Sequence, residues 1–344
     1  NNDTDEYFNL PSTISQNLKA QADQYNPVAL ANLAKSEESS YNIQPEFKLN
    51  YNLLGIEEHK TRLTYEGNIV FNIFNRYNDD FLPSSLVSNG WKSSSANSAS
   101  STSYKSLGIT TTHTLTFTPH FNNEDHSLMM MLRGQLNSGT SSSQNTATYG
   151  LPTGTIISTS APASIGSSFS TSAGQWRSIY FTFSAHYAYK SRYMLDFSVR
   201  RDGSTKFGPD KRWGNFPALS LRWNISDEPW FKKTLPFVSM LSVRPGWGIV
   251  GNQPGAEYLY FSKYVSGKSY LGEGGIYPSN IQLTNLKWEE KHTLNLGVDF
   301  GFFNDKISGN VEVYNQKTKN LLMANRAIPT SSGYSALSYQ NVGT

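Results

Sequence analysis

Few residues of this sequence could do chemistry, and their spacing argues against an enzyme. Among six histidines, His113, His120 and His126 are the nearest to a cluster, and the last two with Asp125 could hold a metal ion. Glu289 and Glu290 are a carboxylate pair, but adjacent residues of a strand point to opposite faces and cannot share a substrate. The sequence has no Gly-x-Ser-x-Gly elbow, no phosphate-binding glycine loop and no His-Glu-x-x-His. We therefore predict no catalytic residue, no bound metal and no cofactor.

Most of the chain instead alternates apolar and polar residues with a period of two, which is typical of β-strands. In one stretch Phe181 and Phe183 alternate with Thr182 and Ser184. Ten such stretches are predicted as strands: 43–54, 61–74, 109–121, 127–137, 176–189, 192–202, 213–225, 238–249, 288–302 and 306–317. The sequence therefore predicts an all-β protein with one apolar and one polar face to its sheet.

The composition favours a sheet whose apolar face lies in lipid. Charged residues make up 16% of the chain, well below the usual share, and aromatic residues make up 13%. The mean hydropathy is −0.48 and no run approaches the length of a transmembrane helix. Charged residues lie within predicted strands, among them Arg200, Arg222 and Asp299. Burying each of these charges unpaired in a dry core would destabilise the folded state by several kcal/mol. A transmembrane β-barrel with a wet lumen removes that cost.

The connections between the predicted strands are alternately short and long. The short ones are 55–60, 122–126, 190–191, 226–237 and 303–305, and the long ones are 75–108, 138–175, 202–212 and 250–287. Outer-membrane barrels have short periplasmic turns and long extracellular loops. We therefore expect the connections after residues 54, 121, 189, 225 and 302 to face the periplasm. A short helix is predicted after Ser226, and aromatic residues near strand ends, such as Tyr193, Trp223 and Trp288, are predicted to form interfacial girdles.

Several ordered blocks of the second half carry a family resemblance. They are Arg200–Pro209, Arg212–Ala218, Leu241–Asn252, Asn285–Glu289, Leu296–Phe300 and Tyr314–Leu322. With these blocks the chain resembles the SusC/RagA family of TonB-linked outer-membrane transporters of Bacteroidota. The family fold is a 22-stranded antiparallel barrel plugged by an N-terminal domain. The resemblance implies that residues 1–344 are one segment of that barrel domain, and that the plug, the TonB box and the C-terminal strands lie outside it.

The resemblance also implies a function and partners. A SusC-like protein imports a large nutrient, an oligosaccharide first and a peptide second, across the outer membrane of a Gram-negative bacterium. It pairs with a SusD-like surface lipoprotein, such pairs can form dimers, and TonB, ExbB and ExbD drive transport through the plug. Outer-membrane lipid surrounds the wall. The net charge is only +3 and no basic stretch concentrates it, so no nucleic-acid partner is expected.

Two sets of residues are predicted to serve this function. Solutes contact a barrel at its adaptable loops and at its water-filled lumen, so the two sets come from these surfaces. Aromatic residues of the long connections are predicted to contact cargo or lid: Phe81, Trp91, Tyr104, Tyr149, Tyr258, Tyr260, Tyr264, Tyr270 and Tyr277. Polar residues of the strands are predicted to line the lumen or touch the plug: Thr182, Ser184, His186, Arg200, Arg222, Asn295 and Asp299.

Three other interpretations of the sequence remain open. The barrel could import another TonB-linked cargo, such as a siderophore or cobalamin, although the block around Asp202 favours the SusC-like class. It could be an adhesin or structural barrel whose long loops hold a partner. Finally, the same alternation would suit a soluble β-sandwich that binds a ligand, which would need no detergent for solubility.

Overall fold

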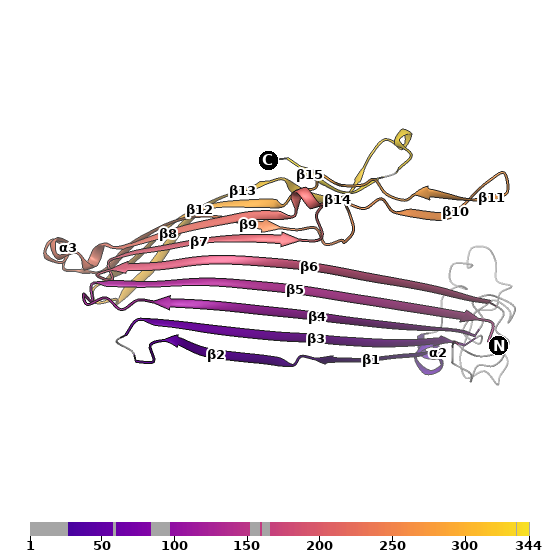
Figure 1. Ribbon diagram of the computed structural model, residues 1–344, viewed down its shortest axis with the longest axis horizontal. Helices are drawn as coiled ribbons and strands as arrows, with labels where there is room; N and C mark the ends of the chain where they lie inside the picture. Colours follow the sequence, from indigo (N-terminus) through magenta and orange to yellow (C-terminus); the bar gives the residue numbers. More distant parts are fainter. Residues whose placement is uncertain are drawn as a thin grey trace. The chain divides into compact units, whose positions relative to one another are not determined.

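The computed structural model describes residues 27–57, 60–83, 97–151, 159, 166–334 and 336–343, and this part of the chain is almost entirely β-structure (Figure 1). Its helical elements are α2 (Pro27–Leu33), η3 (Pro209–Lys211), η4 (Ile225–Asp227), α3 (Pro229–Thr234) and η5 (Thr330–Ser332). Its strands are β1 (Lys35–Ile43), β2 (Glu46–Leu54), β3 (Arg62–Leu82), β4 (Ser98–Thr118), β5 (His126–Tyr149), β6 (Gly166–Tyr189), β7 (Tyr193–Ser204), β8 (Trp213–Asn224), β9 (Val238–Asn252), β10 (Tyr264–Tyr270), β11 (Glu273–Pro278), β12 (Glu289–Phe302), β13 (Ile307–Lys319), β14 (Leu321–Ala327) and β15 (Ala336–Val342). No helix among the described residues is long and apolar enough to cross a membrane.

One eleven-stranded sheet contains most of the strands. Its order is β1-β3-β4-β5-β6-β7-β8-β9-β12-β13, with β2 also paired to β3. The strands pair antiparallel at both edges and from β6 through β13. Strand order largely follows chain order, because most strands pair with their sequence neighbour; the exceptions are β1, which pairs with β3, and β9, which pairs with β12. The pairs β10-β11 and β14-β15 form separate two-stranded sheets. The predicted all-β antiparallel fold is confirmed.

Two of the predicted long loops are wrong in extent. β4 begins at Ser98 and β5 continues to Tyr149, so residues 98–108 and 138–149 of the predicted connections 75–108 and 138–175 belong to strands. β6 likewise begins at Gly166. Serine and threonine suit a strand that is solvated on both faces, and the backbone ladder there supplies the hydrogen bonds that a loop would leave to water. β5 has 24 residues, about twice the 9–11 that a tilted barrel strand needs to cross a bilayer.

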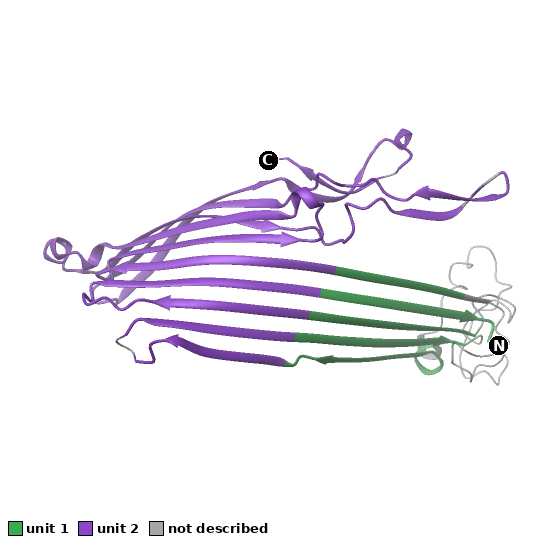
Figure 2. Cartoon of the chain, viewed as in Figure 1, with its two compact units in different colours: residues 1–45, 71–108, 139–175 green, residues 46–70, 109–138, 176–344 purple. Residues whose placement is uncertain are grey.

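The chain divides into two compact units, which Figure 2 shows in different colours. Unit 1 contains residues 1–45, 71–108 and 139–175, and so holds the hydroxyl-rich parts of β4, β5 and β6. Phe81, Ala99 and Leu151 form its small buried cluster. Asn97 donates from Nδ2 to the carbonyl oxygen of Leu151 at 2.9 Å, and Asn145 donates to the Thr102 hydroxyl at 2.9 Å. Unit 1 is thus stabilised mainly by strand pairing and polar contacts, with little apolar core.

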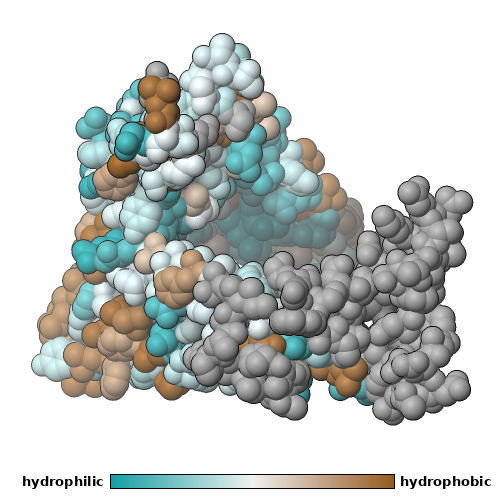
Figure 3. Space-filling model, turned by 90° about the vertical axis from the view of Figure 1, so that its right-hand side faces the viewer, coloured by the Kyte–Doolittle hydropathy of each residue, from teal (hydrophilic) through white to brown (hydrophobic). Residues whose placement is uncertain are grey.

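Unit 2 contains residues 46–70, 109–138 and 176–344, and its strands have two distinct faces. Register places Phe181 and Phe183 on one face of β6 beside Phe197 and Val199 of β7, and Leu219 and Leu221 of β8 continue the row. We call this the apolar face. The Phe197 side chain is 39% exposed, although burial would stabilise a ring of this size by about 1.5–3 kcal/mol in water. Hydrophobic and hydrophilic residues accordingly gather in separate areas of the surface in Figure 3.

A buried cluster lies where the long connections of unit 2 meet. It consists of Phe207, Phe216, Leu259, Leu286 and Trp288, which we call the loop core. The Trp288 ring lies 4.7 Å from Phe207 and 5.6 Å from Phe216 between centroids, and its Nε1 donates to the carbonyl oxygen of Arg212 at 3.1 Å. Trp288 was predicted to belong to an interfacial girdle, and this is wrong because the ring is buried among loop residues. We call this end of the strands the long-connection end.

A short helix occupies the opposite, short-turn end of unit 2 (Figure 1), and aromatic residues lie at the same end. The predicted helix is present as η4 and α3, between β8 and β9. The rings of Tyr189, Tyr193 and Trp223 form a row with centroids 6.3 Å apart at each step. Glu228 accepts hydrogen bonds from the Tyr193 hydroxyl and from Trp223 Nε1, and these donors hold the pKa of the Glu228 carboxyl below its usual value.

Candidate functional site

The second face of the unit 2 sheet is polar, and its residues lie in rows that cross the strands. One row runs through His186, Asp196, Ser220, Gly246 and Asn295. The next runs through Ser184, Ser198, Ala218, Gly248 and Thr293. Each row lies on one face because directly paired residues of antiparallel strands point the same way. We call this surface the polar face.

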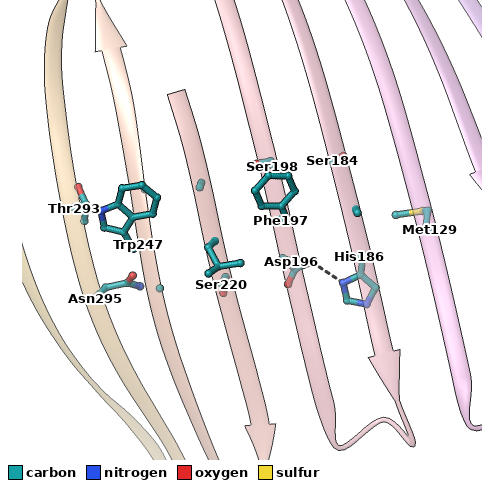
Figure 4. A pocket seen from close by; sticks show the side chains of 15 residues that line it. Met129, Ser184, His186, Asp196, Phe197, Ser198, Ser220, Trp247, Thr293 and Asn295 are labelled. Atoms are coloured by element: carbon teal, nitrogen blue, oxygen red, sulfur yellow. Dashed lines mark hydrogen bonds and ion pairs between the residues drawn. The ribbon is translucent and has the colours of Figure 1, made fainter. Parts of the chain in front are cut away.

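The middle of the polar face is hollowed by a pocket of about 450 Å³ (Figure 4). Ser184, His186, Asp196, Ser198, Ser220 and Asn295 are among its lining residues. The Nδ1 of His186 and Oδ1 of Asp196 lie 2.6 Å apart, which leaves the rest of each side chain open to the pocket. A Cβ at Gly246 would lie 2.4 Å from the Asn295 side-chain oxygen, so a larger residue there would displace the Asn295 amide from its present position. The pocket therefore offers hydroxyl, amide, imidazole and carboxylate groups to a hydrated solute.

An ionic network lies nearer the short-turn end of the same face. Asp299 accepts from Nη2 of Arg244 at 2.7 Å and from the Ser242 hydroxyl at 2.9 Å. The other guanidinium, that of Arg222, lies 3.6 Å from Asp299 and donates to Asn224 at 2.9 Å. The Asp299 side chain is only 14% exposed, so its charge depends on these donors. The network links three adjacent strands, β8, β9 and β12.

Replacing Asp299 by asparagine should break this network. The substitution leaves Arg222 and Arg244 without their shared counter-charge, and the lost charged hydrogen bonds should lower the free energy of unfolding by about 1.5–3 kcal/mol. Urea unfolding of the full-length protein in detergent would measure the change. Asp210→Asn is the matched control, because Asp210 is exposed in η3. Equal effects of the two substitutions would show that the network contributes nothing.

All seven residues predicted to line the lumen lie on the polar face. Thr182 pairs with Arg200, Ser184 with Ser198 and His186 with Asp196, and Arg222, Asn295 and Asp299 share the same side of β8 and β12. The structure brings Ser184, His186 and Asn295 into one pocket and Arg222 and Asp299 into one network. Arg200 stands apart from both, with its Nε 2.6 Å from Asp202 and its guanidinium carbon 4.3 Å from the Tyr180 ring centroid. That these residues line a transport path stays a prediction.

The sequence analysis missed Asp196, Ser220 and Arg244. All three lie in predicted strands at positions of the polar parity, so the alternation could have identified them. Their partners could not be identified in the same way, because the pairing of β9 with β12 joins segments far apart in the sequence.

The aromatic residues predicted to contact cargo are dispersed, and several do not lie in loops. Phe81 is in β3 and buried, Tyr104 is in β4 and Tyr149 is in β5, so their assignment to loops is wrong. Tyr258 and Tyr260 lie in the connection after β9, where the Tyr260 hydroxyl accepts from Arg212 at 3.4 Å. The remaining residues lie as follows: Tyr264 and Tyr270 in β10, Tyr277 in β11, and Trp91 outside the described residues. A role of these rings in cargo binding stays a prediction.

The histidines of the suggested cluster have structural partners. His113 Nδ1 lies 2.7 Å from the Tyr65 hydroxyl, and His126 Nδ1 lies 2.8 Å from the Tyr187 hydroxyl. Among the residues that the structure describes, no group of three or more histidine, aspartate and glutamate side chains could hold a metal ion.

Comparison with known proteins identifies a family for the chain and relatives that match part of it. The family model described as "TonB dependent receptor-like, beta-barrel" matches residues 1–344. The TonB-dependent receptor SusC of Bacteroides thetaiotaomicron is 39% identical over 166 residues, which are 46% of this chain and 16% of SusC. The TonB-dependent receptor P39 of Formosa agariphila is 37% identical over 158 residues, 46% of this chain and 15% of P39. Each match thus spans only a small part of the curated relative.

Solved structures show the same fold. A structure of the RagAB peptide transporter superposes with a TM-score of 0.78 at 18% sequence identity, covering 91% of this chain and 34% of that one. The RagAB peptide importer in its "open-open" state gives a TM-score of 0.76. This likeness concerns the fold, which the present chain shares over about a third of the larger structure.

Proposed function

The chain belongs to the TonB-dependent receptor-like β-barrel family, and from this we propose that it forms part of the wall of an outer-membrane importer for large hydrophilic nutrients. TonB, with ExbB and ExbD, drives the transport by acting on a plug domain elsewhere in the protein. A SusD-like surface lipoprotein closes over the extracellular side, and pairs of the two proteins can dimerise. The wall itself breaks no bond.

The two-faced sheet of unit 2 is the observation that carries this proposal. Its apolar face leaves rings such as Phe181 and Phe197 exposed, as a lipid-facing surface requires. Its polar face carries the pocket around Ser198 and the network around Asp299, as a wet passage requires. A binding protein in water would instead bury one of the two faces.

The cargo that we propose is an oligosaccharide. The pocket presents hydroxyl and amide groups from Ser184, Ser198, Ser220, Thr293 and Asn295, and these groups exchange hydrogen bonds with a neutral polyhydroxylated solute. A peptide is the second candidate, because the protein with the same fold is described as a peptide transporter.

Uptake by whole cells tests the proposal. A strain lacking the gene should lose uptake of at least one labelled oligosaccharide, keep uptake of labelled peptides, and regain the first on complementation. Collapse of the proton gradient should stop the complemented uptake. Ser220→Trp narrows the pocket and should slow uptake, whereas Leu221→Trp, the next residue on the apolar face, should not. Undiminished oligosaccharide uptake in the deletion strain would refute the proposed cargo, and loss of peptide uptake alone would favour the second candidate.

The same barrel has a predicted orientation that labelling can check. This stretch of the protein has no cysteine. A single cysteine at Ser332, in the connection of β14 and β15, should therefore react with a membrane-impermeant maleimide on intact cells. A cysteine at Asn123, in a short turn, should react only after the outer membrane is opened. Labelling of Asn123 on intact cells would invert the orientation.

A further inference from the structure

The connection that contains α3 touches the apolar face of unit 2 at both of its ends. At its start, Glu228 accepts a hydrogen bond from Trp223 Nε1 at 3.2 Å and another from the Tyr193 hydroxyl. At its end, the Phe237 ring stacks on Phe302 with centroids 6.4 Å apart and planes inclined by 19°. Tyr193, Trp223 and Phe302 belong to the apolar face by strand parity. The helix is therefore held at the rim of the apolar face.

Large aromatic side chains stay exposed at this rim, although one aromatic ring of the connection is buried and anchors it. Phe231 is buried beneath α3 and lies edge-on to Trp230, with centroids 5.7 Å apart. Trp230 is nevertheless 56% exposed, and Phe237 and Phe303 are 48% and 57% exposed. Phe237 and Phe303, with centroids 6.2 Å apart, extend the exposed apolar surface past the strand end at Phe302, and Trp230 adds an exposed ring on α3. Rings of this kind are enriched where hydrocarbon meets the lipid headgroups.

Cationic side chains border the exposed rings. Lys232 and Lys233 form the last turn of α3, and Lys306 lies in the turn between β12 and β13. Lys232 lies 3.7 Å from Asp227, and its side chain is still 68% exposed. Lys233 and Lys306 have no ion-pair partner in the described part of the chain. Lysines beside exposed aromatic rings are typical of helices that lie in a membrane interface, where the amines meet lipid phosphates.

We propose that α3 and residues 235–237 form an interfacial foot, which lies in the phospholipid headgroup layer at the short-turn end of the barrel. Trp230 and Phe237 reach the acyl boundary, and Lys232 and Lys233 contact lipid phosphates. The foot extends the lipid-facing surface beyond the ends of the strands. Without it, the connection between β8 and β9 would lie in water. It rests on the proposed membrane location but on neither the cargo nor the transport step.

Fluorescence quenching in lipid nanodiscs tests this placement in the full-length protein. The contribution of Trp230 is the difference in emission between the unsubstituted protein and Trp230→Phe. Phosphatidylcholine brominated close to its headgroup should quench this contribution at least twofold more than lipid brominated near the acyl terminus. Trp288→Phe is the matched control, since Trp288 is buried in the loop core and its contribution should be insensitive to both lipids. Equal or absent quenching of Trp230 would overturn the proposal.

The cationic part of the foot has its own readout. In nanodiscs with equal amounts of phosphatidylcholine and phosphatidylglycerol, native mass spectrometry should find phosphatidylglycerol enriched on the released protein. The double substitution Lys232→Gln and Lys233→Gln should lower that enrichment at least twofold, and Lys263→Gln, at the long-connection end, should not. If Trp230 is unquenched by lipid but becomes shielded on addition of the periplasmic domain of TonB, the surface binds protein and the lipid proposal fails. A variant that imports no cargo should still show lipid quenching, which separates this proposal from the proposed function.

Discussion

Replacing Phe197 by arginine should lower the free energy of unfolding of the barrel by about 2–4 kcal/mol. Phe197 lies mid-strand on the apolar face, where its ring is 6.4 Å from that of Phe183 between centroids. In a barrel wall this position is near the bilayer midplane, and a guanidinium there must leave water without gaining a partner. Urea titration of the full-length protein in lipid vesicles, followed by electrophoretic mobility of the folded form, would measure the loss.

Ser198→Arg supplies the control for this prediction. Ser198 is the next residue of β7, and it lines the pocket on the polar face. The arginine side chain should stay hydrated there, so the cost should fall well below 1 kcal/mol, as is usual for surface substitutions. Comparable losses for both substitutions would indicate that both faces are dry, as in a sandwich core.

Trp288→Ala should destabilise the loop core by about 3–5 kcal/mol, which raises local opening about a hundred- to several-thousand-fold. The substitution removes a ring that is 6% exposed and packs on Phe207 and Phe216. It also removes the hydrogen bond to the Arg212 carbonyl oxygen. Hydrogen exchange should accelerate in residues 253–263, because the Leu259 side chain of this segment packs in the loop core.

The strands should be spared by the same substitution. Amides of β7 and β12 keep their ladder hydrogen bonds, so their exchange should change little. Trp213→Ala is the matched control, since Trp213 is 46% exposed and lies on the apolar face beside Gly203 rather than in the loop core. If both variants accelerate exchange in 253–263 equally, the connection is not organised by the loop core.

Local alternation predicted the two faces of the sheet well. A period of two requires only the residues within one strand, so Thr182, Ser184 and His186 could be assigned to a polar side without knowledge of their neighbours. The same argument predicted the fold class and the side on which Arg222 and Asp299 lie. It failed at 138–149, because serine and threonine are equally frequent in solvated strands and in loops, and only pairing with a neighbouring strand distinguishes the two.

The sequence by itself therefore determined a sheet with an apolar and a polar side, since both follow from side-chain direction along single strands. The tertiary structure alone decided which residues meet across strands and loops. Arg244 reaches Asp299 through the pairing of β9 with β12, and Trp288 finds Phe207 through connections that fold back on each other. It also decided that the segment after β8 lies against the apolar face. These contacts depend on strand register and on loop closure over long sequence separations, and neither can be predicted from the order of neighbouring residues.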